Sequence, residues 1–428
     1  MPPVMPQSKK NSGLPVTLNH QKQETKRLLA DNFADRLLES TNAPSIVNTN
    51  FSPDNKKPSI HLPSNSLSSF QSINDSGSQT PTDKNSFTVG SRKSNLAVVQ
   101  SEMVIQYLTE AFPKKSFPLV TMSTTGDRVL DVALSKIGEK ALFTKELEYA
   151  LEDKSVDLVV HSLKDLPTVL PEGMEISSIL KREDPRDVVI FPSYSRSKYS
   201  NLSDLPDGSQ IGTSSVRRIA QLSKAFPHLK FLDIRGNLNT RFKKLEDPES
   251  GYSAIILAAA GVKRLGFSNI ISQYLDDTCM YYAVGQGALA IETRSDDEHT
   301  KNVVLKLAHT KTLLECVAER GLMRFLEGGC SIPIGVWSTW IPSESPDDQP
   351  SLLLRGVVSS IDGEDRIKAQ YSAQIFPQGI SIDSQFSDLS PESQKLIYNN
   401  AENVGYKLGE IMNEMGASRI LSNINNKH

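Results

Sequence analysis

Cysteine is scarce in this sequence: Cys279, Cys316 and Cys330 are its three cysteines among 428 residues. They lie too far apart to form a metal-binding motif, and an odd number of cysteines argues against a disulfide framework. The seven histidines add no ligand spacing, so we predict no metal centre. Such low cysteine content is typical of a reducing compartment, and we therefore expect a cytoplasmic protein.

Long apolar runs and an excess of charge of one sign are also missing. No stretch approaches the about 18 consecutive apolar residues of a membrane-spanning helix, so we expect no membrane partner. The formal net charge of −3 gives no reason to expect nucleic acid as a partner. The apolar content of 38% is typical of a protein with an extensive core.

The first 85 residues differ in composition from the rest of the chain. They are rich in Ser, Asn, Pro and Gln and show no sustained hydrophobic period, which favours a disordered leader. An organelle transit peptide is the alternative, because such peptides are often rich in serine. We prefer the first interpretation, because this segment mixes Asp and Glu with its basic residues and transit peptides contain few acids.

From residue 86 onward, strand-like apolar runs alternate with helix-like segments. A first β-rich run ends at Gly90, where Ser91 could cap a following helix. Further strand-like runs occur in "VDLVVHS", "SQIGTSS", "FLDIRGN" and "SAIILAAAG". This alternation predicts βαβ units and largely parallel sheets.

After about residue 350 the pattern changes. Two strand-like segments flank an Asp362-Gly363 turn, as in a β-hairpin. Residues 390–415 have the spacing of a long amphipathic helix, and residues 341–350 resemble a surface loop. The sequence therefore predicts an α/β protein with two α/β domains and a smaller C-terminal α+β domain.

Arginine and hydroxyl residues collect where the predicted strands end. Ligands of open parallel sheets bind beyond the carboxyl ends of the strands. Backbone N–H groups at a helix start can bind an anion, and guanidinium groups match the geometry of carboxylates. Taken singly, each residue could be a solvated arginine or a helix cap, but together they imply a ligand with several carboxylates or phosphates. The candidates are Arg92 and Ser94, then Thr213, Ser214, Arg217 and Arg218, then Arg235 and Arg241.

The stretch "VVHSLKDLP" (159–167) places three ionisable residues at another strand end. We interpret His161 as a hydrogen-bonded core histidine, and Lys164 as either a surface residue or a ligand contact. Asp165 should remain charged near so many arginines, which suits it to stabilise a developing cation. The alternative for Asp165 is a turn residue that bonds its own backbone.

Cys330 stands in the unusual context "FLEGGCSIPIG" (325–335), directly after two glycines. Free cysteine is usually buried among apolar neighbours, whereas a glycine loop leaves a thiol accessible. The placement indicates that another group has to reach this sulfur.

Eight strings in this order resemble the porphobilinogen deaminase (hydroxymethylbilane synthase) family. The match runs from about Phe87 to about Val336, with a looser continuation in the C-terminal domain. The strings are "GSRKSNLAVVQ", "TTGDRVLD", "GEKALFTKELE", "DLVVHSLKDLP", "GTSSVRR", "IRGNLNTR", "AVGQGALAIE" and "LEGGCSIPIG". The family usually has proline where this sequence has Asn95, a residue still compatible with a helix start.

The resemblance implies two periplasmic-binding-protein-like α/β domains with a central cleft, plus the third domain. It places the first α/β domain over 86–184 and 283–303, the second over 185–282, and the α+β domain over 304–428, whereas the leader over 1–85 is not part of the family's core. It also implies a monomer without a metal.

The resemblance further implies an enzyme that joins four molecules of porphobilinogen, with loss of ammonia, and releases hydroxymethylbilane. Porphobilinogen carries an acetate and a propionate on its pyrrole ring, which would explain the arginines. By resemblance, Cys330 holds a dipyrromethane cofactor through a thioether and Asp165 is the catalytic residue. The implied cofactor-binding residues are Lys164, Asp165, Thr213, Ser214, Arg217, Arg218 and Arg235, and the implied substrate-binding residues are Arg92, Ser94, Arg235 and Arg241.

Two alternatives belong to other classes. A non-catalytic, two-lobed binding protein for an anionic ligand would need the same arginines but no cofactor on Cys330. A cysteine hydrolase would need a histidine against Cys330, and the resemblance offers none.

Overall fold

The computed structural model describes residues 84–124, 144–326, 332–343 and 349–425, all within the unit Asp83–His428. Almost all of the predicted leader, the loop cysteine Cys330 and the middle of the predicted 341–350 loop lie outside the described residues. Among the described helices, none is both long and apolar enough to cross a membrane.

The first sheet has five strands in the order β2-β1-β3-β10-β4. Strands β1, β2 and β3 are parallel, and β10 is antiparallel to both β3 and β4. Four of the five strands therefore run in the same direction. The strands are β1 (Val89–Arg92), β2 (Leu119–Met122), β3 (Leu158–Ser162), β4 (Met174–Ile179) and β10 (Leu289–Arg294).

Helix α2 begins three residues later than the sequence predicts. Ser91 and Arg92 stay in the β1 ladder, opposite Thr121 and Met122 of β2. The helix is instead capped by Ser94, whose Oγ accepts a hydrogen bond of 3.4 Å from the Ala97 amide. Strand pairing thus overrides Ser91 as a cap. The helical elements next to this sheet are α2 (Asn95–Ala111), α4 (Lys145–Glu152), the 3₁₀ turn η2 (Leu163–Asp165) and α8 (Glu298–Leu305).

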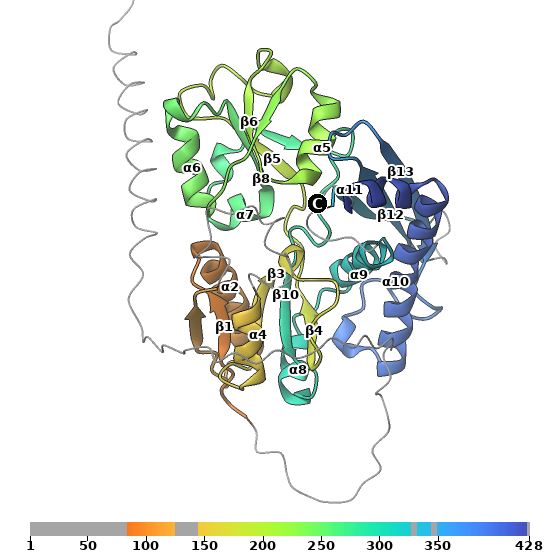
Figure 1. Cartoon of the computed structure of the whole chain (residues 1–428). Helices are drawn as coiled ribbons and strands as arrows, with labels where there is room; N and C mark the ends of the chain where they lie inside the picture. Colours follow the sequence, from red (N-terminus) through yellow and green to blue (C-terminus); the bar gives the residue numbers. More distant parts are fainter. Residues whose placement is uncertain (1–83, 125–143, 327–331, 344–348, 426–428) are drawn as a thin grey trace, which may run out of the picture. The chain divides into compact units, whose positions relative to one another are not determined.

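The second sheet repeats the plan of the first, in the order β7-β6-β8-β5-β9. Strands β6, β7 and β8 are parallel, and β5 is antiparallel to β8 and β9. The helices α5, α6 and α7 follow β6, β7 and β8 (Figure 1). Both sheets are largely parallel, as predicted. The elements are β5 (Asp187–Ile190), η3 (Leu202–Asp204), β6 (Gln210–Gly212), α5 (Val216–Ala225), β7 (Lys230–Leu232), α6 (Leu238–Glu246), η4 (Pro248–Ser250), β8 (Ala254–Ala258), α7 (Ala259–Arg264), η5 (Ser268–Ile270) and β9 (Gln273–Leu275).

Two crossover segments join the sheets: residues 180–186 lead from β4 to β5, and residues 276–288 lead from β9 back to β10. They run side by side, because the Glu183 amide donates to the Gly287 carbonyl at 3.2 Å. Gly287 has φ +89°, and a Cβ there would lie 2.4 Å from the Glu183 carbonyl oxygen. This close approach requires glycine.

The third sheet is antiparallel, in the order β11-β12-β13, and lies against a pair of long helices. Helices α9 and α10 pack side by side (Figure 1), so closely that a Cβ on Gly405 would lie 2.1 Å from the Ala318 carbonyl oxygen. The predicted hairpin and the predicted long helix are both confirmed. The elements are α9 (Thr310–Phe325), β11 (Ile334–Ile341), β12 (Ser351–Ser359), β13 (Arg366–Gln374), η6 (Phe386–Asp388), α10 (Pro391–Glu414) and α11 (Ala417–Asn425).

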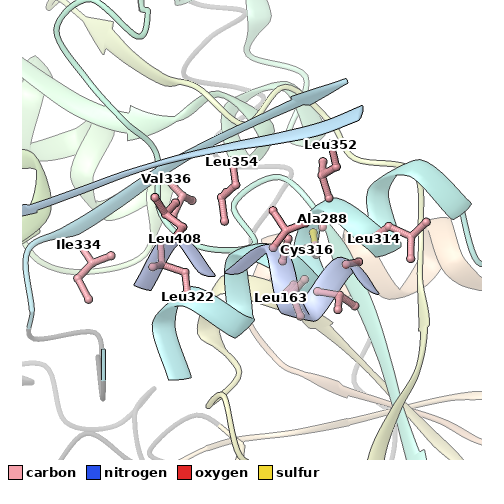
Figure 2. Packing of buried hydrophobic residues seen from close by; sticks show 14 of the residues in the cluster. Leu163, Ala288, Leu314, Cys316, Leu322, Ile334, Val336, Leu352, Leu354 and Leu408 are labelled. Atoms are coloured by element: carbon pink, nitrogen blue, oxygen red, sulfur yellow. The ribbon is translucent and has the colours of Figure 1, made fainter. Parts of the chain in front are cut away.

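One apolar cluster extends from the third sheet to the end of β3. Figure 2 shows Cys316 of α9 among Leu314, Ala288 and Leu163. Leu163 lies directly after β3 and packs beneath Gly285 of the second crossover, where an added Cβ would meet its Cγ at 2.8 Å. The residues after β3 are therefore anchored by the same core as α9.

The expected architecture of two periplasmic-binding-protein-like sheets and a smaller α+β part agrees with this topology.

Candidate active site

The strand-to-helix turns of the two large sheets meet one another. Leu96 lies in the first turn of α2, Leu238 begins α6, and Gly261 lies in α7. A Cβ on Gly261 would be 3.3 Å from Leu238 Cδ1 and 3.5 Å from Leu96 Cδ2. Because each of these helices follows a parallel strand, the carboxyl ends of both sets of strands face one region, where such sheets bind ligands.

Lys164 and Asp165 enter this region on the 3₁₀ turn that follows β3. The turn is held from below by Leu163 and Leu166, which are 1% and 4% exposed. Just before it, the Ser162 hydroxyl and the Gln100 side-chain amide of α2 exchange hydrogen bonds of 3.0 and 3.2 Å. Lys164 is partly buried and Asp165 is exposed, so the carboxylate is available to a ligand.

The charges from the two sheets act on one another. Burial lowers the pKa of the Lys164 amine; the neighbouring Asp165 carboxylate opposes that change and Arg218 reinforces it. Burial also lowers the pKa of Arg241, helped by Arg218 and opposed by Asp233 and Asp165. The turn after β3 and the helices α5 and α6 of the second sheet thus contribute charges that act on one another.

Arg217 and Arg218 are buried and share one carboxylate, that of Asp187. Arg217 Nη1 donates to Asp187 Oδ2 at 2.7 Å, and Arg218 Nε and Nη2 donate to Oδ1 at 3.0 and 2.8 Å. The two arginines are 5% and 6% exposed. They are therefore part of a built charge network, which their positions early in a helix did not reveal.

Thr213 and Ser214 fasten the turn between β6 and α5. Thr213 is buried, and its Oγ1 accepts from the Ser215 amide at 3.3 Å. Ser214 Oγ donates to the Ile234 carbonyl at 2.6 Å and accepts from the Ile234 amide at 3.2 Å. The hydroxyl of Ser214 thus ties the end of β6 to the segment after β7.

The remaining predicted residues lie at the same strand ends. Arg235 pairs with Asp233, and Arg241 Nε donates to the Gly236 carbonyl at 2.8 Å. Arg92 ends β1, next to β3 in the first sheet, and Ser94 caps α2. These residues therefore lie at strand ends of the two large sheets, where the sequence pattern predicted them.

His161 is a core residue, as predicted. It is 6% exposed, and its Nε2 lies 2.8 Å from Oε2 of the fully buried Glu292. It therefore supports β3 from inside the sheet.

Arginines of helix α9 donate hydrogen bonds to the backbone of the segment that follows Asp165. Arg320 Nη2 donates to the Pro167 carbonyl at 2.6 Å and its Nη1 to the Leu166 carbonyl at 3.4 Å. Arg324 Nη1 reaches the Thr168 carbonyl at 3.4 Å. Burial, together with the charge of Arg324, lowers the pKa of Arg320 to about 10.

The structure describes the residues on both sides of 327–331. Before them, Leu326 at the end of α9 belongs to the apolar cluster that contains Leu163. After them, Gly335 lies against α5, since a Cβ there would be 2.9 Å from Gln221 Nε2. Gln221 is one helical turn beyond Arg217. Cys330 itself lies outside the described residues.

A second buried charge pair connects the crossovers to the third sheet. Arg182 Nη1 and Nη2 donate to the two carboxylate oxygens of Glu319 at 2.8 and 2.7 Å. Glu319 also accepts from the Gly285 amide at 2.8 Å and from Ser338 Oγ at 2.7 Å. One fully buried carboxylate therefore joins both crossovers to β11.

Sequence reasoning missed Asp187, Gln286, Glu319 and Arg320. A weak signal existed for each charged one: Asp187 begins the apolar run "DVVIF", and Glu319 and Arg320 interrupt the apolar stretch "CVAERGL". A charge in a buried segment needs a partner, but the sequence does not tell which one.

The fold and the site define a class of protein. The two large sheets present their strand ends to one region that holds several arginines, a lysine and the exposed carboxylate of Asp165. This arrangement suits the binding and the chemical conversion of a small ligand with several carboxylates.

Known proteins identify the family. The family description "Porphobilinogen deaminase, dipyromethane cofactor binding domain" matches residues 87–302, and "Porphobilinogen deaminase, C-terminal domain" matches residues 313–414. The chain belongs to the porphobilinogen deaminase family and carries its dipyrromethane cofactor-binding domain.

Individual relatives agree over most of their length. The porphobilinogen deaminase of Nostoc sp. (strain PCC 7120) is 44% identical over 336 residues, which cover 78% of this chain and 94% of the relative. The porphobilinogen deaminase of Dictyostelium discoideum is 46% identical over 304 residues, covering 70% and 93%. That of Kluyveromyces lactis is 43% identical over 345 residues, covering 80% and 98%.

The described residues fit a dipyrromethane with carboxylate side chains. Arg217 and Arg218 carry two positive charges and share the single negative charge of Asp187. One positive charge of this buried group is left for an anionic ligand, and Arg241 and Lys164 add to it. The donor set is therefore suited to carboxylates.

We predict that Arg320→Lys lowers the free energy of unfolding by about 1–3 kcal/mol, because a lysine ammonium cannot reproduce the fork that reaches two backbone carbonyls. Urea denaturation measures the change. The matched control is Arg419→Lys, the same substitution at an exposed position of α11, which should leave stability unchanged. Equal stability of Arg320→Lys and the wild type would refute a holding role for the Arg320 guanidinium.

Proposed function

We propose that this protein condenses four molecules of porphobilinogen, with loss of one ammonia from each, and then releases hydroxymethylbilane by hydrolysis. This is the activity of a hydroxymethylbilane synthase, a transferase of tetrapyrrole synthesis. The observation that carries the proposal is the exposed carboxylate of Asp165, which follows β3 and lies beside cationic groups of both sheets. Family membership supports this enzyme over a non-catalytic anion-binding protein.

Asp165 is proposed to stabilise positive charge on the substrate. When ammonia leaves the aminomethyl group of porphobilinogen, the remaining pyrrole becomes cationic. A nearby carboxylate lowers the energy of that state, because preorganised charge acts most strongly where new charge develops. The backbone after Asp165 is held by Arg320 of α9, so the carboxylate does not have to be positioned during the reaction.

The arginines are proposed to bind the acetate and propionate groups. Arg217, Arg218 and Arg235, with Lys164, Thr213 and Ser214, would hold the cofactor, and Arg92, Ser94, Arg235 and Arg241 would hold the incoming substrate. Two of these residues work indirectly: Ser214 already bonds the Ile234 backbone and Ser94 caps α2. Their contribution to binding would come from the shape of the turns and their backbone N–H groups.

Cys330 is proposed to carry the cofactor through a thioether. Dipyrromethane, once attached, supplies the terminal pyrrole carbon to which the first substrate is joined. The other two cysteines are poor candidates, because a thiol reacts as its thiolate. Burial and the Asp276 carboxylate raise the pKa of Cys279 to about 11, and Cys316 lies in the apolar core, where burial raises its pKa further.

The proposed enzyme has three domains, over 86–184 with 283–303, over 185–282 and over 304–428. The active-site cleft would lie between the first two. The monomeric state and the cytoplasmic location stay predictions that follow from the resemblance and from the low cysteine content.

We predict that the purified wild type, made in cells that supply porphobilinogen, exceeds its sequence mass by two pyrrole units and that Cys330→Ser does not. Intact-mass spectrometry measures this directly. The matched control Cys279→Ser should keep the excess. A wild-type chain that forms product while its mass shows no added pyrrole would contradict covalent attachment at Cys330.

We predict that Asp165→Asn keeps the fold and the added mass but lowers kcat by about 100-fold or more, because the developing cation loses its counter-charge. Steady-state assay of porphobilinogen consumption checks this. The control Asp207→Asn removes an exposed carboxylate from the loop before β6 and should leave kcat unchanged. A kcat of Asp165→Asn near the wild-type value would refute the proposed role of Asp165 in stabilising the cation.

A further inference from the structure

Asp187 is a fully buried carboxylate at the start of β5, with both oxygens engaged. Its Oδ2 accepts from Arg217, and its Oδ1 accepts from Arg218 and, at 3.1 Å, from the side-chain amide of Gln286. It is 0% exposed, so no part of it can reach a ligand in solution. Any effect of Asp187 on ligand binding must therefore act through Arg217 and Arg218.

The contacts with Asp187 fix the direction of each guanidinium. Arg217 Nη1 also donates to the Tyr281 carbonyl, and Arg218 Nη1 donates to the Ile256 carbonyl, both at 2.7 Å. A guanidinium is planar and has five N–H groups in a fixed fork. Once two or more of them are bound, the directions of the others are set.

Charge explains why a carboxylate is needed at this place. Two buried guanidinium groups repel each other. Burial lowers the pKa of Arg218, and the positive charge of Arg217 lowers it further, whereas the negative charge of Asp187 raises it. Burial alone would raise the pKa of Asp187, but Arg217 and Arg218 outweigh it and lower that pKa. The three side chains therefore form one unit with one net positive charge.

The unit is attached to both crossover segments. Asp187 directly follows the first crossover, and Gln286 belongs to the second. The Gln286 amide donates to Asp187 and also, at 2.6 Å, to the Pro185 carbonyl. The arginine pair on α5 is thus fixed to the two segments that join the large sheets.

We infer that Asp187 is a positioning residue for the proposed condensation: it orients Arg217 and Arg218 toward the carboxylates of the pyrrole chain and fixes them to both crossovers. The inference rests on the proposed function and adds a residue that never touches the ligand. Removing its charge should loosen the two arginines and weaken carboxylate binding, whereas Asp165 would keep its place.

The test uses the full chain with Asp187→Asn and Asp187→Ala. The amide oxygen of asparagine still accepts a hydrogen bond, so Asp187→Asn retains the shape of the site if Asp187→Ala fails to fold. Two quantities are measured: the KM for porphobilinogen, and the rate at which unloaded protein gains the mass of two pyrrole units. We expect loading to slow by about ten- to hundredfold, as when a charged hydrogen bond is lost. We expect KM to rise as well, because the arginine pair holds the chain to which each substrate is joined.

A purely structural role predicts a different pattern. A partly unfolded enzyme loses apparent kcat in proportion to its inactive fraction, while its KM and the loading rate of the folded fraction stay the same. Soluble Asp187→Asn with wild-type KM and loading rate, whatever its thermal stability, would overturn the inference.

Asp184→Asn is the matched control. Asp184 lies in the first crossover, three residues before Asp187. Its carboxylate accepts hydrogen bonds of 2.7–3.2 Å from the Arg186 guanidinium, and both side chains are partly exposed. This variant should keep both quantities at wild-type values. Wild type that neither loads nor forms product in the same assay would refute the proposed function itself, whereas active wild type with unaffected Asp187 variants would refute the inference alone.

Discussion

The structure depends on one buried carboxylate that two guanidinium groups share. Asp187 lies where the chain first enters the second sheet, and Arg217 and Arg218 reach it from α5. Breaking a buried ion pair by removing one partner is strongly destabilising, because the other charge stays buried. The attachment of α5 to both crossover segments and the charge of the site therefore depend on the same few side chains.

The third sheet and its helices extend this principle to the turn that carries Asp165. Glu319 joins Arg182 of the first crossover to Gly285 of the second, and Arg320, the next residue of α9, binds the carbonyls after Asp165. One helix thus supports the crossovers and the aspartate turn, and the same helix leads directly into residues 327–331. In the proposed mechanism, the helix that binds the segment after Asp165 is also the helix that precedes the cofactor loop in the sequence.

Much of this arrangement could be predicted from the sequence, because its signals are local. Apolar runs indicated β3, β6 and β8, the Asp362-Gly363 turn indicated the last hairpin, and "HSLKD" indicated an acid at a strand end. The start of α2 was misplaced, because pairing with β2 keeps Ser91 in a strand. Asp187 was missed because its partners lie about 30 residues away and meet it only after the second sheet has formed. The family resemblance supplied the role of Cys330, which no local pattern specifies.

In the proposed enzyme, the carboxylates of a pyrrole chain on Cys330 are held by an arginine pair that Asp187 orients, and Asp165 faces the reacting ring. A crystal structure of the full chain loaded with porphobilinogen tests this most directly. We expect electron density that is continuous from the Cys330 sulfur into the pyrrole chain. We also expect the ring carboxylates within hydrogen-bond distance of Arg217 and Arg218, and the Asp165 carboxylate beside the pyrrole nitrogens. Ring carboxylates bound elsewhere, with Arg217 and Arg218 contacting only Asp187 and the backbone, would contradict it.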